Sequence, residues 1–164
     1  MIEAASYILA DIGGTHARFA LLAKGQVSEE QTLAASEYRS LTAALEAYRG
    51  SHAVPDNAAL AIATAAVPDD QGVWHFHNEN SWEIDPAALT RGGIKVALIV
   101  NDFVASARGV VSLPQDKFVT LRSGKPLADR ASAVLGPGTG LGLAFAIRLA
   151  EGGWHVQPTH GGHM

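Results

Sequence analysis

The sequence predicts an α/β fold built on a mixed β-sheet, followed by an incomplete second domain of the same type. Three observations favour this fold class. Three strand patterns occupy the first 34 residues with only tight turns between them, which is typical of an antiparallel meander. Strand and helix patterns then alternate up to residue 112, which favours parallel strands joined by helical crossovers. Later in the chain, a strand, a glycine-rich turn and another strand repeat the opening pattern.

The first two strands, residues 7–11 and 17–23, flank the turn Asp11-Ile12-Gly13-Gly14-Thr15. Adjacent glycines can take positive φ and let the chain reverse sharply, which suits an ordinary hairpin. The same glycines leave backbone N–H groups able to hold phosphate oxygens, and a carboxylate at a strand end can position Mg²⁺. The turn alone is compatible with both interpretations.

The later elements of the first domain follow from capping residues and apolar runs. In order, the sequence predicts a strand over 27–34, a helix capped by Ser40 and closed by Gly50, a buried strand over 58–65, a short strand over 73–76, a helix that starts at Asp85-Pro86 and ends at Gly92-Gly93, a strand over 95–100 and a helix over 104–111.

Leu113-Pro114 marks the expected boundary between a first domain over 1–112 and a second over 113–164. The second domain is expected to contain strands over 118–121, 133–135, 143–149 and 154–156. Because only the strand-turn-strand opening is repeated before Met164, we expect this domain to be the beginning of a larger lobe.

Composition excludes several classes of protein. The chain has 164 residues, a net charge of −4 and no cysteine, so it shows no electrostatic footprint for nucleic acid, no disulfide and no thiolate metal site. No apolar run reaches the roughly 18 residues that a membrane span needs, and no signal peptide is recognised. We therefore expect a cytoplasmic protein that binds neither nucleic acid nor membrane. The histidines, among them the pair His75 and His77, favour packing and polar contacts over a metal site, because no carboxylate is spaced to complete it.

Two further stretches could carry chemistry. Asn101-Asp102 follows a buried strand, where open α/β sheets place their ligands, and Asp102 could act there as a general base. The same pair could simply cap the following helix. The cluster Gly136-Pro137-Gly138-Thr139-Gly140-Leu141-Gly142 matches neither the Walker nor the dinucleotide pattern, and it fits either a flexible hairpin or a backbone site for an anion.

Taken together and in order, these stretches resemble the bacterial glucokinase family, within the superfamily of actin, the sugar kinases and the heat-shock chaperone ATPases. The resemblance rests on Asp11 to Thr15 with Arg18, on Asn101-Asp102-Phe103, on Gly136 to Gly142 and on Gly161-Gly162-His163. It implies a ribonuclease-H-like sheet and the ATP-dependent phosphorylation of glucose at its 6-hydroxyl, a step of glycolysis.

The resemblance also implies residue roles. Asp102 would be the catalytic base, and the sugar would be bound by Asn101, Asp102, His160 and His163. The phosphates of ATP would lie against Gly13, Gly14, Thr15, Gly138, Thr139 and Gly140. Asp11 would hold Mg²⁺ through water.

Two departures from the family pattern modify these expectations. His160 stands where the family has a Glu, and an imidazole accepts one hydrogen bond from a sugar hydroxyl where a carboxylate accepts two. The chain also stops short of the family's second lobe, so we expect it to have no useful kinase activity by itself. The alternative is a non-catalytic sugar- or phosphate-binding module of the same fold. The sequence leaves three questions open. They are which hexose is the substrate, whether ATP or polyphosphate is the phosphate donor, and whether the chain forms a homodimer.

Overall fold

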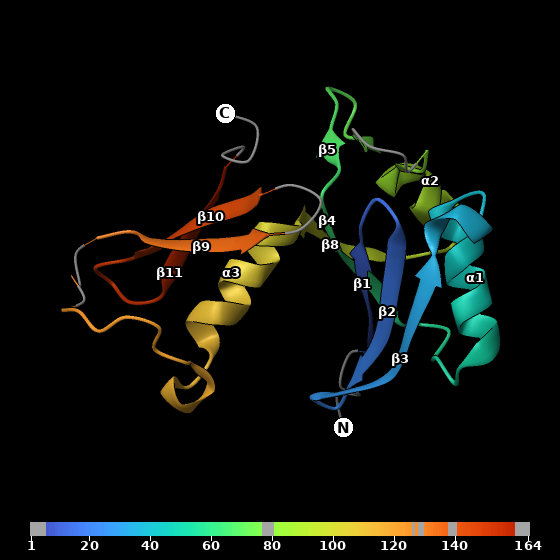
Figure 1. Cartoon of the computed structure of the whole chain (residues 1–164). Coiled ribbons are helices and arrows are strands. Elements are labelled where there is room, and N and C mark those ends of the chain that lie inside the picture. The colour runs from blue at the N-terminus through green and yellow to red at the C-terminus, as the bar shows by residue number, and fades with distance from the viewer. Residues whose placement is uncertain (1–5, 77–80, 126, 128–129, 138–140, 160–164) are drawn as a thin grey trace. The chain divides into compact units, whose positions relative to one another are not determined.

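The computed structural model describes residues 6–76, 81–125, 127, 130–137 and 141–159, and the chain divides into two compact units, Met1–Asn101 and Asp102–Met164 (Figure 1). The division falls before the helix over Asp102–Ser112, whereas the sequence placed the boundary after it. This helix joins the second unit because its buried side chains pack against strands of that unit.

A five-stranded mixed sheet forms the first unit, in the order β3-β2-β1-β4-β8. Its strands are β1 (Tyr7–Ile12), β2 (His16–Ala23), β3 (Gln26–Ala34), β4 (Ala59–Thr64) and β8 (Val96–Asn101). β1, β2 and β3 pair antiparallel, and β4 pairs parallel with both β1 and β8. The sheet is therefore mixed, as the sequence predicted.

The helix α1 (Leu41–Ser51) supplies much of the core of this unit. Its N-cap is Ser40, whose hydroxyl accepts a hydrogen bond from the backbone N–H of Ala43 at 3.2 Å. The buried positions Leu41, Ala44, Leu45 and Tyr48 follow helical spacing, and they join apolar residues of β1, β2 and β4 in one cluster. The helix continues through Gly50 to Ser51, one residue beyond the predicted end.

A small antiparallel sheet and a short helix complete the first unit. The sheet consists of β5 (Val67–Pro68), β6 (Trp74–His75) and β7 (Glu83–Ile84) in sequence order. The helix α2 (Pro86–Arg91) begins where the Asp85-Pro86 signal predicts, and the Asp85 carboxylate accepts hydrogen bonds from the N–H groups of Ala87 and Ala88 at 2.8 and 3.0 Å.

The second unit places one helix on one face of a three-stranded antiparallel sheet. The helix is α3 (Asp102–Ser112), and the strands β9 (Ser132–Pro137), β10 (Leu141–Arg148) and β11 (Trp154–Pro158) lie in the order β11-β10-β9 (Figure 1). The buried core of this unit consists of Ala107 from the helix and Ala144, Ala146 and Val156 from the sheet.

Two sequence-based expectations for this unit were wrong. The strand expected over 118–121 does not form, and Val119 and Leu121 are 85% and 95% exposed. An apolar run becomes a strand only where another strand pairs with it, which is not a property of the run itself. α3 also starts at Asp102 rather than at Val104, so Asp102 lies within its first turn.

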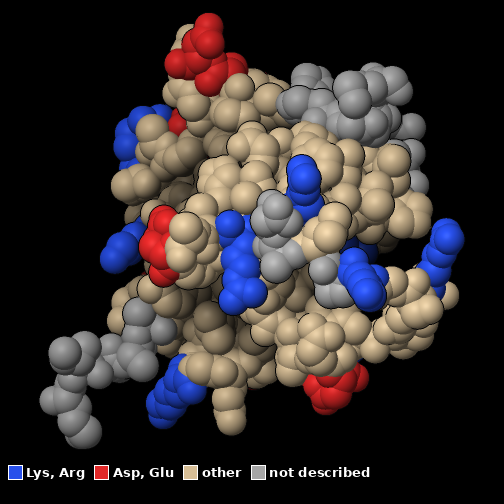
Figure 2. Space-filling view, turned by 90° about the vertical axis from the view of Figure 1, so that its left-hand side faces the viewer, with Lys and Arg blue, Asp and Glu red and all other residues tan. Residues whose placement is uncertain are grey.

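The face drawn in Figure 2 is mostly uncharged. Lys and Arg side chains are spread over it together with some Asp and Glu side chains, and they do not form one continuous patch. Among the described residues, no helix is long and apolar enough to cross a membrane.

Two glycine substitutions test the backbone assignments. Gly109 lies in α3 with open space where a Cβ would stand, so Gly109→Ala should stabilise the chain by about 1 kcal/mol through helix propensity. Gly25 has a φ of 76° in the β2–β3 turn, where Lys24 also has a positive φ of 52°. Gly25→Ala should cost about 1 kcal/mol, because L-residues disfavour this region. Urea denaturation of both variants measures the two changes in the free energy of unfolding. A change of the same sign and size in both variants would contradict the backbone conformations given for Gly109 and Gly25.

Candidate active site

The carboxyl ends of the three parallel strands lie in one row. In the register of the sheet, Ile12 pairs with Thr64, and Thr64 pairs with Asn101. Neighbouring strands are about 4.8 Å apart, so this row brings the Gly13 to Thr15 turn, Thr64 and Asn101 to the same edge of the first unit. Open α/β sheets bind their ligands at this edge.

The turn after β1 is closed by backbone hydrogen bonds. The N–H of Gly13 donates to the carbonyl of His16 at 2.9 Å, and the N–H of Ala35 donates to the carbonyl of Thr15 at 2.9 Å. Contrary to the expectation of a positive φ, Gly13 lies outside the left-handed region, and a Cβ there would make only an ordinary 3.6 Å contact with His16. Neither a positive φ nor close packing therefore requires glycine at this position.

Thr64 holds this turn against β4, and sequence reasoning missed it. Its fully buried hydroxyl donates to the carbonyl of Ile12 at 3.0 Å and accepts from the N–H of Ala66 at 3.1 Å. In the sequence, Thr64 lies inside the apolar run of the predicted strand over 58–65 and looks like one more strand-forming residue. The one available signal is its position, since a polar residue at the carboxyl end of a buried parallel strand lies where ligands bind.

Asp11 is paired with a cation of the same hairpin. Its Oδ2 accepts from Nη1 of the cross-strand residue Arg18 at 2.8 Å, and both side chains are at least half exposed. Among the described residues, no three His, Cys, Asp or Glu side chains form a group that could hold a metal ion. A single carboxylate with one oxygen engaged fits a water-mediated Mg²⁺ contact, because Mg²⁺ keeps most of its waters and takes its other ligands from phosphates.

Asp102 follows Asn101 at the junction of β8 and α3, and both are partly buried. The Oδ1 atom of Asp102 accepts a hydrogen bond from the backbone N–H of Phe103 at 2.9 Å. This bond comes from the next residue along the chain, whereas an N-cap side chain accepts from an N–H two or three residues on, so the contact is not a capping bond. A carboxylate has about four acceptor sites, so this bond is compatible with a role as base.

The outer glycines of the 136–142 cluster, Gly136 and Gly142, pack against an aromatic ring, whereas the sequence suggested a backbone site for an anion or a flexible hairpin. Gly136 and Gly142 pair across β9 and β10, and the ring of Phe103 lies against both. A Cβ would stand 2.6 Å from Cζ of Phe103 at Gly136 and 1.6 Å from Cε2 at Gly142. These two glycines accommodate an aromatic ring rather than an anion. The inner residues Gly138, Thr139 and Gly140 lie outside the described residues, as do His160 and His163.

His75 contacts the carboxylate of Asp69 and lies near the carboxylate of Glu83. Its Nε2 lies 3.0 Å from Oδ2 of Asp69 and its Nδ1 lies 3.6 Å from Oε1 of Glu83. The hydrogen bond with His75, followed by those from the N–H groups of Val73 and Gln71, lowers the pKa of Asp69 below its ordinary value. This agrees with the polar-contact interpretation of His75, and His77 lies outside the described residues.

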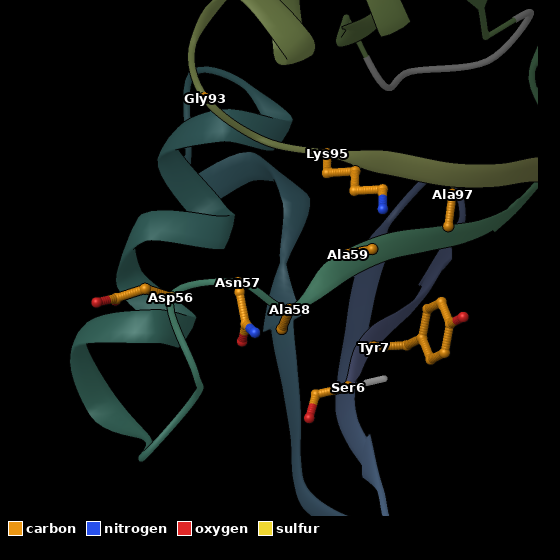
Figure 3. A pocket seen from close by; sticks show the side chains of 9 residues that line it. All are labelled: Ser6, Tyr7, Asp56, Asn57, Ala58, Ala59, Gly93, Lys95 and Ala97. Atoms are coloured by element: carbon orange, nitrogen blue, oxygen red, sulfur yellow. The ribbon is translucent and has the colours of Figure 1, made fainter. Parts of the chain in front are cut away.

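A pocket of about 510 Å³ lies at the other end of the parallel strands (Figure 3). It is lined by residues at and just before the starts of β1, β4 and β8, with Tyr7 and Lys95 among its side chains. None of the predicted site residues lines it, and it lies at the amino ends of the strands, where this class of sheet does not bind its ligands.

Comparison with known proteins gives one consistent result. The family model described as Glucokinase matches residues 8–164. The chain is 37% identical over 160 residues to a glucokinase of Pseudomonas paraeruginosa and 36% identical over 163 residues to one of Paramagnetospirillum magneticum, covering 96% of this chain in both cases. It spans about half the length of these relatives, 47% and 49%.

Solved structures agree. A glucokinase from an Antarctic psychrotroph superimposes with a TM-score of 0.73 at 30% identity, over 97% of this chain and 51% of that one. A Balamuthia mandrillaris glucokinase, solved in complex with glucose, gives 0.63 at 21% identity over 96% and 48% of the two chains, which supports the fold alone.

Thr64 gives a direct test of how the edge is held together. Thr64→Val keeps the shape but leaves two buried groups, the Ile12 carbonyl and the Ala66 N–H, without their partner, and each should cost about 1–3 kcal/mol. Thr64→Ser keeps the hydroxyl and should lose only the small contribution of one methyl group, about 1 kcal/mol. Urea denaturation measures both, and a Val variant as stable as the Ser variant would contradict this role.

Proposed function

Because the chain belongs to the glucokinase family, we propose that it carries the phosphate-binding turn, the sugar-binding residues and the catalytic base for phosphorylation of glucose by ATP at the 6-hydroxyl. The observation that carries this proposal is the row Ile12, Thr64 and Asn101, which brings the turn after Asp11 and the start of Asn101-Asp102 to one edge of the sheet. We assign the reaction to glycolysis in the cytoplasm on the family alone.

Asp102 acts as the base in this proposal. Its carboxylate accepts the proton of the 6-hydroxyl while that oxygen attacks the γ-phosphorus of ATP, and the bond to the β,γ-bridging oxygen breaks to release ADP. The Phe103 N–H on Oδ1 fixes the orientation of the carboxylate. Asn101 hydrogen-bonds sugar hydroxyls from the preceding position, and His160 and His163 contribute further hydrogen bonds.

The turn after Asp11 binds phosphate. The backbone N–H of Gly14 and the hydroxyl of Thr15 are donors suited to phosphate oxygens. Gly13 would line the phosphates beside them, while its own N–H closes the turn by donating to the carbonyl of His16 at 2.9 Å. Gly138, Thr139 and Gly140 line the phosphates from the second glycine turn. When bound, Mg²⁺ neutralises the phosphate charge, and Asp11 would hold it through water.

The chain spans about half the length of the relatives it matches, and we propose that it does not turn over glucose by itself.

The finer fold proposal is that its five-stranded sheet is ribonuclease-H-like and that the second unit is an incomplete domain of the same type. The supporting observation is that β9, β10 and β11 repeat the antiparallel order of β1, β2 and β3. The alternative is a sugar- or phosphate-binding module without catalysis, which the replacement of the family's Glu by His160 favours.

Calorimetry and a coupled assay test these proposals. For the 164-residue chain we expect glucose to bind and Asp102→Ala to weaken that binding, with no turnover. For a fusion of this chain to the part of the Pseudomonas relative beyond the matched region, we expect turnover that Asp102→Asn lowers about a hundredfold or more. Asp85→Asn is the matched control, because Asn caps a helix as well as Asp.

The outcomes separate the alternatives. Glucose binding with no turnover in the fusion supports the non-catalytic module. Turnover that survives Asp102→Asn overturns the assignment of the base, and turnover by the 164-residue chain alone overturns its proposed inactivity.

We also propose that the chain forms a homodimer. The face of the β9–β10 hairpin away from α3 is apolar, and Leu135, Leu141 and Ile147 on it are 40–59% exposed. Burying such side chains against a second copy removes apolar surface from water. Sedimentation analysis should show a dimer that Leu135→Glu dissociates, and a monomeric parent chain would contradict the proposal. Val119→Glu, at an exposed position outside this face, is the control.

A further inference from the structure

The ring of Phe103 packs against the backbone of β9 and β10 within the second unit. Gly136 and Gly142 face each other across β9 and β10, and both would place a Cβ inside contact distance of this ring. At Gly142, three ring atoms lie 1.6, 1.9 and 2.2 Å from the Cβ position, where real Cβ contacts below 3.0 Å are essentially absent. The two glycines therefore permit a ring-to-backbone approach that any side chain would block.

The rest of α3 packs on the same sheet through one alanine and two valines, Ala107, Val104 and Val111. Ala107, one helical turn after Phe103, is fully buried in a cluster with Ala144 and Ala146 of β10. Phe103 is thus the one aromatic side chain by which this helix packs on the sheet. Its ring fixes the position of the first turn of α3 relative to the β9–β10 hairpin.

The same residue holds the neighbouring carboxylate. The backbone N–H of Phe103 donates to Oδ1 of Asp102 at 2.9 Å. The first N–H groups of a helix have no intrahelical partner, so this donor is available to a side chain. A fixed ring fixes this N–H, and the N–H in turn fixes the Asp102 carboxylate.

We propose that Phe103 is a positioning residue for Asp102, and that its contact with the Gly136–Gly142 pair holds the carboxylate at a defined place relative to β9 and β10. This inference rests on the proposed role of Asp102. It also gives the glycines of the cluster different roles. The outer pair, Gly136 and Gly142, packs against the ring, and the inner residues Gly138, Thr139 and Gly140 keep the proposed role of phosphate binding.

The first test measures amide hydrogen exchange at position 103 by NMR in the 164-residue chain. Asp102→Ala should accelerate this exchange about tenfold if the carboxylate is the acceptor. Gly142→Ala should accelerate it similarly by displacing the ring, and Phe103→Ala should do so by removing it. Gly109→Ala, in the same helix with open space around it, is the matched control and should leave the exchange unchanged.

The second test separates positioning from packing. Phe103→Ala combined with Gly142→Ala relieves the overlap, so its unfolding temperature should exceed that of Gly142→Ala alone. Glucose affinity, measured by calorimetry, should stay about tenfold weaker than in the parent chain, because no ring holds the first turn. Phe103→Leu combined with Gly136→Ala should recover affinity in part, because Leu lacks the Cζ and Cε1 atoms that crowd position 136.

The results distinguish two failures. The positioning role is overturned if Phe103→Ala changes neither the amide exchange at position 103 nor the affinity for glucose. It is also overturned if the Phe103→Ala and Gly142→Ala double variant regains the glucose affinity of the parent chain along with its unfolding temperature. A parent chain that binds no glucose overturns the proposed function instead, and the exchange measurement then still decides whether Phe103 positions Asp102.

Discussion

The common end point of the three parallel strands is the constraint on which the first unit's site depends. Ile12, Thr64 and Asn101 share one row because β1, β4 and β8 pair in a fixed register. A slip of one residue would turn buried side chains such as Ile8 and Ile62 out of the core, so apolar packing fixes this register. The hydroxyl of Thr64 then holds the strand ends together at the row itself. The edge is thus assembled by core packing far from it.

Glycine has two different uses among the described residues, and each has its own physical reason. At Gly25 and Gly93 the backbone has φ values of 76° and 84°, which glycine tolerates best. At Gly136 and Gly142 the conformation is ordinary, and the absent side chain admits the ring of Phe103. Gly13 has neither requirement. Interpreting a glycine cluster as a phosphate site therefore needs the surroundings of each glycine.

The two units differ in how much apolar surface they bury. The first has a core of large side chains, among them Phe19 and Tyr48, whose rings stack with centroids 5.2 Å apart. The buried core of the second consists of three alanines and one valine, and the other face of its sheet carries exposed leucines. Since hydrophobic stabilisation scales with buried apolar area, the first unit supplies most of it.

The sequence by itself determined the features that depend on local interactions. The caps at Ser40 and Asp85 bond to N–H groups two or three residues away, and both helices begin where predicted. It also singled out Asp11, the turn to Thr15 and Asn101-Asp102. Only the tertiary structure decided that residues 118–121 form no strand, that Thr64 joins two strand ends, and that Phe103 lies against Gly136 and Gly142. The contacts of Thr64 with Ile12 and of Phe103 with the two glycines join residues that are 33 to 52 positions apart in the chain, and no local pattern encodes which segment will supply a partner.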